Sequence, residues 1–165
     1  MKSKTQKIVF AALLASLVCV ATMIIKIPSP LKGYINLGDC VVLLCGWTLS
    51  PMYAFLAAGI GSGLADLFAG YVVYAPVTFI IKGVMALIAY YGIKSAKGKV
   101  GNILPLIISG IVAEIVMILG YYVFEGFMYG FIPSVANIPA NGVQGVAGVL
   151  IGVVLYKIFD KNKIL

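Results

Sequence analysis

The sequence lacks several residues on which common protein chemistry depends. Its 165 residues include no histidine and no arginine, and only 10% of them are charged. Without histidine, a zinc site or a Cys–His nucleophile pair is not expected. Arginine provides most bidentate contacts with guanine and phosphate, so its absence argues against nucleic-acid binding. We therefore expect no nucleic-acid partner, no metal and no cofactor.

Two further features of enzymes are missing. Cys19, Cys40 and Cys45 lie in apolar runs without a paired spacing, as buried small side chains commonly do. The nearest approach to a phosphate-binding loop runs from Gly92 to Lys99. There, five residues instead of four separate the glycines, and no serine or threonine follows the lysine. We expect that the chain does not hydrolyse ATP and is not an enzyme.

Long apolar runs dominate what is present. Apolar residues make up 62% of the chain, and its mean hydropathy is +1.11, whereas soluble domains are about half apolar. A helix that crosses the hydrocarbon needs roughly 20 such residues. The sequence predicts one all-α integral membrane domain over residues 1–165, with six transmembrane helices. Its apolar runs cover residues 8–25, 36–49, 52–69, 76–93, 103–124 and 137–159.

The second run is short for a full span and is expected to start or tilt within the interface. Two longer connectors are predicted on one side of the bundle. Residues 26–34 contain Pro28, Pro30 and Gly33, and residues 125–136 form a loop with glycines, aromatic residues and Pro133.

The lysines predict how the chain is oriented. With the N-terminus in the cytoplasm, nine lysines fall on the inner side, two on the outer side, and Lys82 alone within a span. Such a bias is typical of membrane proteins, whose cytoplasmic loops are rich in lysine. We therefore expect both termini in the cytoplasm of a prokaryotic cell and the chain in its plasma membrane. The inner lysines are Lys2, Lys4, Lys7, Lys94, Lys97, Lys99, Lys157, Lys161 and Lys163, and the outer ones are Lys26 and Lys32.

Polar residues within the spans gather in the outer half of the predicted bundle. Lys82 lies about two turns into its span, Glu114 is near the middle of another, and Tyr121 follows Glu114 on the same face. Asn141 and Gln144 continue a stripe that begins at Asn137. Ionisable groups inside a membrane are costly and mark functional sites. We expect an outward-opening cavity lined by Lys82, Glu114, Tyr121, Asn141 and Gln144.

Simpler explanations of these residues remain open. Asp39 and Asp66 are expected nearer the rim of the cavity or at helix ends that face water. Lys82 and Glu114 can form a structural ion pair, and Asn141 and Gln144 can hydrogen-bond between helices.

Small residues four apart allow helices to approach closely. Ala11 and Ala15 form such a pair at the lysine-rich end of the first run, and Ser16 adjoins it. Because of its position, this pair is predicted to contact an external partner.

Three segments resemble a known family. They are the sequence Gly33-Tyr34-Ile35-Asn36-Leu37-Gly38-Asp39, the small-residue run 57–70, and residues 74–83. They are similar to the substrate-binding S components of energy-coupling factor (ECF) vitamin transporters, particularly the group associated with hydroxymethylpyrimidine, pyridoxine and riboflavin.

The resemblance implies a membrane protein that binds a vitamin from outside and then associates with a transmembrane coupling subunit and two ATPases. It also implies that Ala11 and Ala15 dock on the coupling subunit and that the connectors 26–34 and 125–136 cap the pocket. Thiamin-binding members stack their ligand on tryptophans, whereas Trp47 lies toward the inner end of its span. Stacking would therefore fall to Tyr34, Tyr74, Tyr121 or Tyr122.

The predicted function is high-affinity capture of a small heteroaromatic vitamin or precursor of the hydroxymethylpyrimidine or vitamin B6 type. Riboflavin is the alternative ligand, and a membrane structural or assembly protein or a stand-alone carrier is the alternative function. Because the predicted pocket carries both signs of charge, a neutral or zwitterionic ligand is expected. The predicted ligand-binding residues are Tyr34, Asn36, Asp39, Tyr74, Lys82, Glu114, Tyr121, Asn141 and Gln144.

Overall fold

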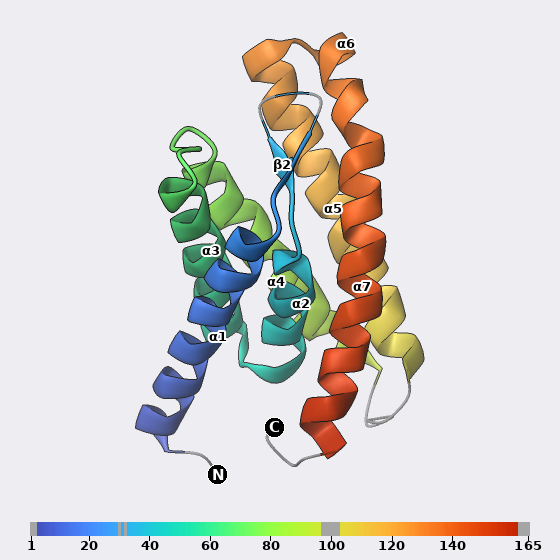
Figure 1. Ribbon diagram of the computed structural model, residues 1–165. Coiled ribbons are helices and arrows are strands. Elements are labelled where there is room, and N and C mark those ends of the chain that lie inside the picture. The colour runs from blue at the N-terminus through green and yellow to red at the C-terminus, as the bar shows by residue number, and fades with distance from the viewer. Residues whose placement is uncertain (1–2, 30, 32, 97–102, 162–165) are drawn as a thin grey trace.

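The protein is a bundle of helices with one short hairpin (Figure 1). The computed structural model describes residues 3–29, 31, 33–96 and 103–161. Five helical segments are long and apolar enough to cross a membrane: Lys4–Ile24, Pro51–Phe68, Ala75–Ser95, Ile103–Tyr129 and Phe131–Lys161. The elements in chain order are α1 (Lys4–Ile24), β1 (Ile27–Pro28), β2 (Tyr34–Ile35), α2 (Gly38–Thr48), α3 (Pro51–Phe68), α4 (Ala75–Ser95), α5 (Ile103–Tyr129), α6 (Phe131–Ser134), the 3-10 helix η1 (Val135–Asn137) and α7 (Ile138–Lys161).

The helices pack in a simple order. α3 lies between α1 and α4, and α5 lies between α4 and α7. α2 is central, because it contacts α1, α3, α4 and α7. The predictions of helices over residues 52–69 and 76–93 are confirmed by α3 and α4. Pro76 lies in the first turn of α4 as expected, where a missing backbone N–H costs nothing.

The second predicted span differs from expectation. α2 has 11 residues, so it is about 16 Å long, roughly half of the hydrocarbon thickness. All residues of α2 from Gly38 to Trp47 are buried, as expected for a helix that is apolar on every side. The prediction of six membrane-crossing helices is therefore not confirmed within the described residues, where five helices meet the length criterion.

The hairpin explains why α2 is so short. β1 and β2 pair in antiparallel register, with Ile27 opposite Ile35 and Pro28 opposite Tyr34. Figure 1 shows the hairpin rising from the end of α1 and returning to the start of α2 deep in the bundle. The first turn of α2 therefore lies inside the molecule and not at its outer surface.

The predicted loop over residues 125–136 is wrong. α5 continues to Tyr129, and α6 and η1 follow at once. Gly130 alone interrupts the helical path, with φ of +97°, a conformation that favours glycine. Pro133 does not break α6, because it lies within its first turn, where backbone N–H groups have no partner in the helix.

α2 and α4 approach each other closely. A Cβ atom added to Gly46 would lie 2.4 Å from the backbone oxygen of Ala86 and 2.6 Å from the Cβ of Ala89. Only glycine fits at this contact, which holds the central helix against α4.

Candidate functional site

A polar cavity lies in the half of the bundle that contains the hairpin. Its free volume is about 40 Å³. The hairpin, its flanking residues and the helices α1, α3, α4, α5 and α7 all contribute to its wall. The lining residues are Thr22, Ser29, Gly33, Tyr34, Asn36, Ser62, Asp66, Tyr71, Tyr74, Thr78, Lys82, Tyr121, Glu125, Asn137, Asn141 and Gln144.

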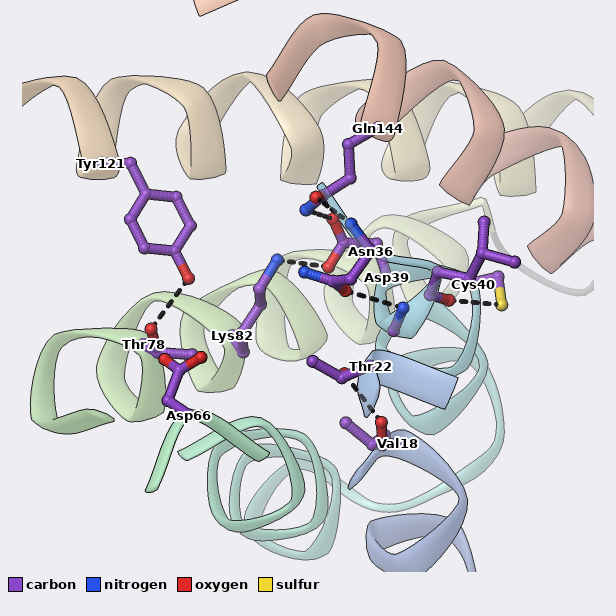
Figure 2. Close-up of polar contacts among 12 residues, drawn as sticks. Val18, Thr22, Asn36, Asp39, Cys40, Asp66, Thr78, Lys82, Tyr121 and Gln144 are labelled. Carbon is purple, nitrogen blue, oxygen red and sulfur yellow. Dashed lines mark hydrogen bonds and ion pairs between the residues drawn. The ribbon is translucent and has the colours of Figure 1, made fainter. Parts of the chain in front are cut away.

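A buried ion pair forms the floor of the cavity (Figure 2). The ammonium group of Lys82 donates to Oδ1 of Asp39, and Gln144 Nε2 donates to Oδ2 of the same carboxylate at 2.6 Å. Lys82 is 3% exposed and Asp39 is 0% exposed. Because Asp39 lies in the first turn of α2, the positive end of the helix dipole also stabilises its charge.

The same network holds the hairpin. The backbone N–H of Asn36 donates to Gln144 Oε1 at 2.8 Å, and the side-chain oxygen of Asn36 accepts from the N–H of Gly38 at 2.8 Å. Gln144 therefore connects the end of the hairpin to the carboxylate that holds Lys82.

Tyrosines and a second carboxylate form one wall. The hydroxyl of Tyr34 donates to Asp66 Oδ1 at 2.6 Å, and the rings of Tyr34 and Tyr71 have centroids 4.8 Å apart. Burial, followed by the hydrogen bond to Asp66, raises the pKa of Tyr34, so its hydroxyl remains a neutral donor. The ring centroids of Tyr71 and Tyr74 are 6.2 Å apart.

A third carboxylate lies near the top of the cavity. Oε1 of Glu125 accepts from Asn137 Nδ2 at 2.8 Å and lies 3.4 Å from the Tyr74 hydroxyl. Asn137 Oδ1 accepts from the backbone N–H of Leu31 at 3.1 Å. Asn137 therefore fastens the turn of the hairpin to the junction of α5 and α7. Within the described residues, no three side chains that could hold a metal ion converge.

A family model for the S component of the ECF-type riboflavin transporter matches residues 2–161. The chain belongs to this family. An uncharacterized protein in a gap 3' region of Pyrococcus woesei is 35% identical over 136 residues, which cover 82% of this chain and 88% of that protein. A solved structure described as the S component of a bacterial ECF transporter aligns with a TM-score of 0.74 and 25% identity. The alignment covers 96% of this chain and 98% of that one.

These findings establish the general class of the protein. It is a transporter S component with several membrane-spanning helices, and its family is not an enzyme class. S components of ECF transporters work with a membrane coupling subunit and ATPases.

The S component brings most of the predicted ligand residues together. Those that line the cavity are Tyr34, Asn36, Tyr74, Lys82, Tyr121, Asn141 and Gln144. Asp66 was expected nearer the rim or at a helix end. It belongs to the last turn of α3 and is 5% exposed on the cavity wall.

Two predicted ligand residues do not line the cavity. Asp39 lies behind Lys82 and not near the rim, because α2 starts deep in the bundle. Glu114 lies on the far side of Asp39, against Gly145 and Gly148 of α7, and faces an apolar groove between α5 and α7. The alternative explanation of Lys82 and Glu114 as a structural ion pair does not match the structure, where Asp39 holds the ammonium group of Lys82. Both carboxyl oxygens of Glu114 have no hydrogen-bond partner among the described residues.

Glu125 is the important residue that the sequence analysis missed. It was placed in a loop, although it follows Tyr121 by four residues and Glu114 by eleven, a spacing that keeps all three on one helix face. Had α5 been extended by one turn, this spacing would have placed Glu125 in the cavity. Trp47 does not line the cavity, and neither does Tyr122.

The predicted docking pair on α1 has mixed exposure. Ala11 is 9% exposed and packs within the bundle, whereas Ala15 is half-buried. The neighbouring Ala12 and Ser16 have the same spacing and are exposed.

Proposed function

We propose that this S component captures a small heteroaromatic vitamin or vitamin precursor from outside the cell. The main support for this proposal is the polar cavity lined by tyrosines, which lies in one half of an otherwise apolar bundle. Flat rings stack on aromatic side chains, and a few polar groups at their edges give orientation and specificity. Tyr34, Tyr71 and Tyr74 offer such ring contacts, and Asn36, Asn141 and Gln144 offer edge contacts.

Two ligand types fit this proposal. The description of the family names riboflavin, a larger and neutral compound. A pyrimidine or pyridine compound, such as hydroxymethylpyrimidine or a form of vitamin B6, is favoured by the charged groups that reach the cavity wall.

The proposed orientation places both termini in the cytoplasm. The start of α1 and the end of α7 lie at the end of the bundle opposite the α5–α6 junction (Figure 1). Lys4, Lys7, Lys94 and Lys161 belong to helix ends on that side, as the positive-inside rule requires. Lys2, Lys32, Lys97, Lys99 and Lys163 lie outside the described residues. With this orientation the cavity opens outward.

The proposed partners are a transmembrane coupling subunit and two ATPases, with docking through the lysine-rich end of α1, where Ala11 and Ala15 lie. The described polar residues of this chain supply a binding site, so the energy for import has to come from the partner subunits.

Purification and ligand identification test the proposal. The full-length protein is purified from its host in mild detergent and denatured, and the released ligand is identified by ultraviolet absorbance and mass spectrometry. Riboflavin, pyridoxine and hydroxymethylpyrimidine are then titrated into ligand-free protein. Saturable one-to-one binding of at least one compound is expected, and Gln144→Ala should weaken it by about 2- to 15-fold, the effect of one lost hydrogen bond. A folded protein that releases no aromatic compound and binds no member of the vitamin panel would instead favour a structural role.

A further inference from the structure

Among the described residues, the cavity wall holds two carboxyl groups, those of Asp66 and Glu125, and one lysine. Lys82 is the one lysine that lines it among the described residues, and its ammonium group is bonded to Asp39. This ion pair is neutral as a unit. Any other carboxylate on the cavity wall therefore needs a different source of positive charge.

Two carboxylates on the wall have neutral partners. Asp66 is 5% exposed and Glu125 is 2% exposed. Asp66 is bonded to the hydroxyl of Tyr34, and Glu125 to the amide of Asn137 and the hydroxyl of Tyr74. Such donors stabilise a carboxylate but do not neutralise it. Charges buried in a membrane protein are costly unless they are paired.

Among the described residues, two that line the cavity carry buried polar atoms without a hydrogen-bond partner. The second oxygen of Glu125, Oε2, is buried and has no hydrogen-bond partner among the described residues, and the same holds for the hydroxyl of Ser62. Both residues line the cavity. Buried polar atoms nearly always have partners in folded proteins, so these two atoms indicate where a ligand binds.

The aromatic residues fit a positively charged ligand as well. Tyr34, Tyr71 and Tyr74 form a continuous row of rings, with successive centroids 4.8 Å and 6.2 Å apart. Tyr34 at one end is bonded to Asp66, and Tyr74 at the other end is bonded to Glu125. The faces of aromatic rings attract cations, and cages of such rings recognise organic ammonium groups.

We infer that this cavity selects a heteroaromatic ligand that carries a positive charge, such as an ammonium group on a flat ring, which Asp66 and Glu125 neutralise between the tyrosines. The inference rests on the proposed function and makes it more specific. It differs from the neutral or zwitterionic ligand expected from the sequence, because the positive charge of Lys82 is already paired within the protein.

Two related forms of vitamin B6 provide the test. Pyridoxamine carries an aminomethyl group where pyridoxine carries a hydroxymethyl group, so the two differ by one ammonium charge at nearly constant shape. Dissociation constants for both compounds, and for the neutral probe riboflavin and the cationic probe thiamin, are measured on full-length protein in lipid nanodiscs. Pyridoxamine is expected to bind at least tenfold more tightly than pyridoxine.

Isosteric variants identify the groups that recognise the charge. Asp66→Asn and Glu125→Gln should each weaken pyridoxamine binding at least tenfold while changing pyridoxine binding less than threefold. Glu114→Gln is the control, because it makes the same Glu-to-Gln change at a buried carboxyl group that lies outside the cavity wall. This control variant should change the dissociation constants of pyridoxamine and pyridoxine by less than threefold. If a variant does not fold, the dissociation constants of pyridoxamine and pyridoxine on the unmodified protein still show whether the cavity selects a positive charge.

The outcomes separate this inference from the proposed function. Binding of riboflavin or pyridoxine as tight as that of the cationic probes would overturn the charge selection and leave vitamin capture intact. Failure of every probe to bind folded protein would overturn both.

Discussion

At the scale of single residues, the central contact of the polar network is the ion pair between Lys82 and Asp39. Both groups are buried, and Gln144 occupies the remaining carboxylate oxygen. Removing one partner of a buried pair leaves an uncompensated charge and typically costs about 3–5 kcal/mol, whereas removing both costs much less. The pair therefore stabilises the bundle only as a unit, and it keeps Lys82 at the floor of the cavity.

A double-mutant cycle on these two residues measures the contact. Asp39→Asn and Lys82→Met should each lower the free energy of unfolding strongly, and the double variant should regain part of the loss. The coupling energy is expected near 2–3 kcal/mol, the upper end of the range for contacting residues. Unfolding in mixed micelles, followed by tyrosine and tryptophan fluorescence, provides the measurement.

The same cycle on Lys82 and Glu114 is the control. Among the described residues, Lys82 is bonded to Asp39 and not to Glu114, which lies beyond Asp39, so the coupling of Glu114 to Lys82 should be clearly smaller. A larger coupling for Lys82 with Glu114 than for Lys82 with Asp39 would instead support the Lys82–Glu114 ion pair that the sequence left open as an alternative.

At the scale of elements, the sequence predicts where helices begin and end along the chain better than how deeply each helix lies in the bundle. The boundaries of α3 and α4 differ by at most two residues from those expected, because prolines and glycines end these runs. The depth of α2 was not predictable, since a helix that is apolar on all sides gives no periodic signal for where it lies. The sequence predicts that tyrosine and amide side chains line the site, because their spacing puts them on one face of a helix. It does not predict that Asp39 is the partner of Lys82, because that contact depends on where α2 begins.

The close contact of α2 with α4 gives a prediction with a matched control. Gly46→Ala would place a methyl group 2.4 Å from the backbone oxygen of Ala86, so the two helices must separate or distort. We expect a loss of about 1–3 kcal/mol, the usual cost of overpacking. Gly142→Ala in α7 meets no atom within 4 Å and should be neutral or slightly stabilising, because alanine favours helix. Thermal unfolding in detergent compares the two variants, and equal melting temperatures would contradict the tight packing of α2.

The hairpin gives a second prediction at this scale. Asn137 bonds the backbone N–H of Leu31 and also Glu125. Asn137→Ala should release the turn of the hairpin, so backbone amides between Ser29 and Asn36 should exchange with deuterium about tenfold faster. This factor corresponds to about 1.4 kcal/mol of lost local stability. Asn141→Ala, about one turn after Asn137 and in α7, should leave exchange unchanged, because Asn141 makes no hydrogen bond to the hairpin residues that the structure describes. Equal exchange in both variants would show that Asn137 does not hold the turn.

At the scale of the whole molecule, the proposed orientation can be tested through helix ends that the structure describes. Single cysteines replace Lys26, Lys94 or Lys161 in a variant whose own three cysteines are serine. In intact cells, an impermeant thiol reagent should block the cysteine at position 26 and leave those at 94 and 161 reactive. Blocking at 94 or 161 from outside would invert or overturn the proposed topology.

The association with a coupling subunit is also a property of the whole molecule, and the structure refines how it should be tested. Ala11 is buried in the bundle, so a bulky residue there would damage the fold as well as any docking surface. Ala12 and Ser16 have the same spacing on the exposed side of α1, where small residues let a partner helix approach closely.

Ala12→Trp and Ser16→Trp should therefore abolish co-purification with the coupling subunit and ATPases from the same organism, with ligand affinity and melting temperature unchanged. The physical reason is that a bulky side chain separates the two helices and removes their dispersion contacts. Leu17→Trp is the control, because this exposed position already carries a large side chain and should tolerate another. Ala15→Trp distinguishes docking through Ala12 and Ser16 from docking through Ala11 and Ala15. If it blocks the complex while Ala12→Trp and Ser16→Trp do not, the partner docks on the Ala11–Ala15 side, and α1 must move away from α3 to admit it.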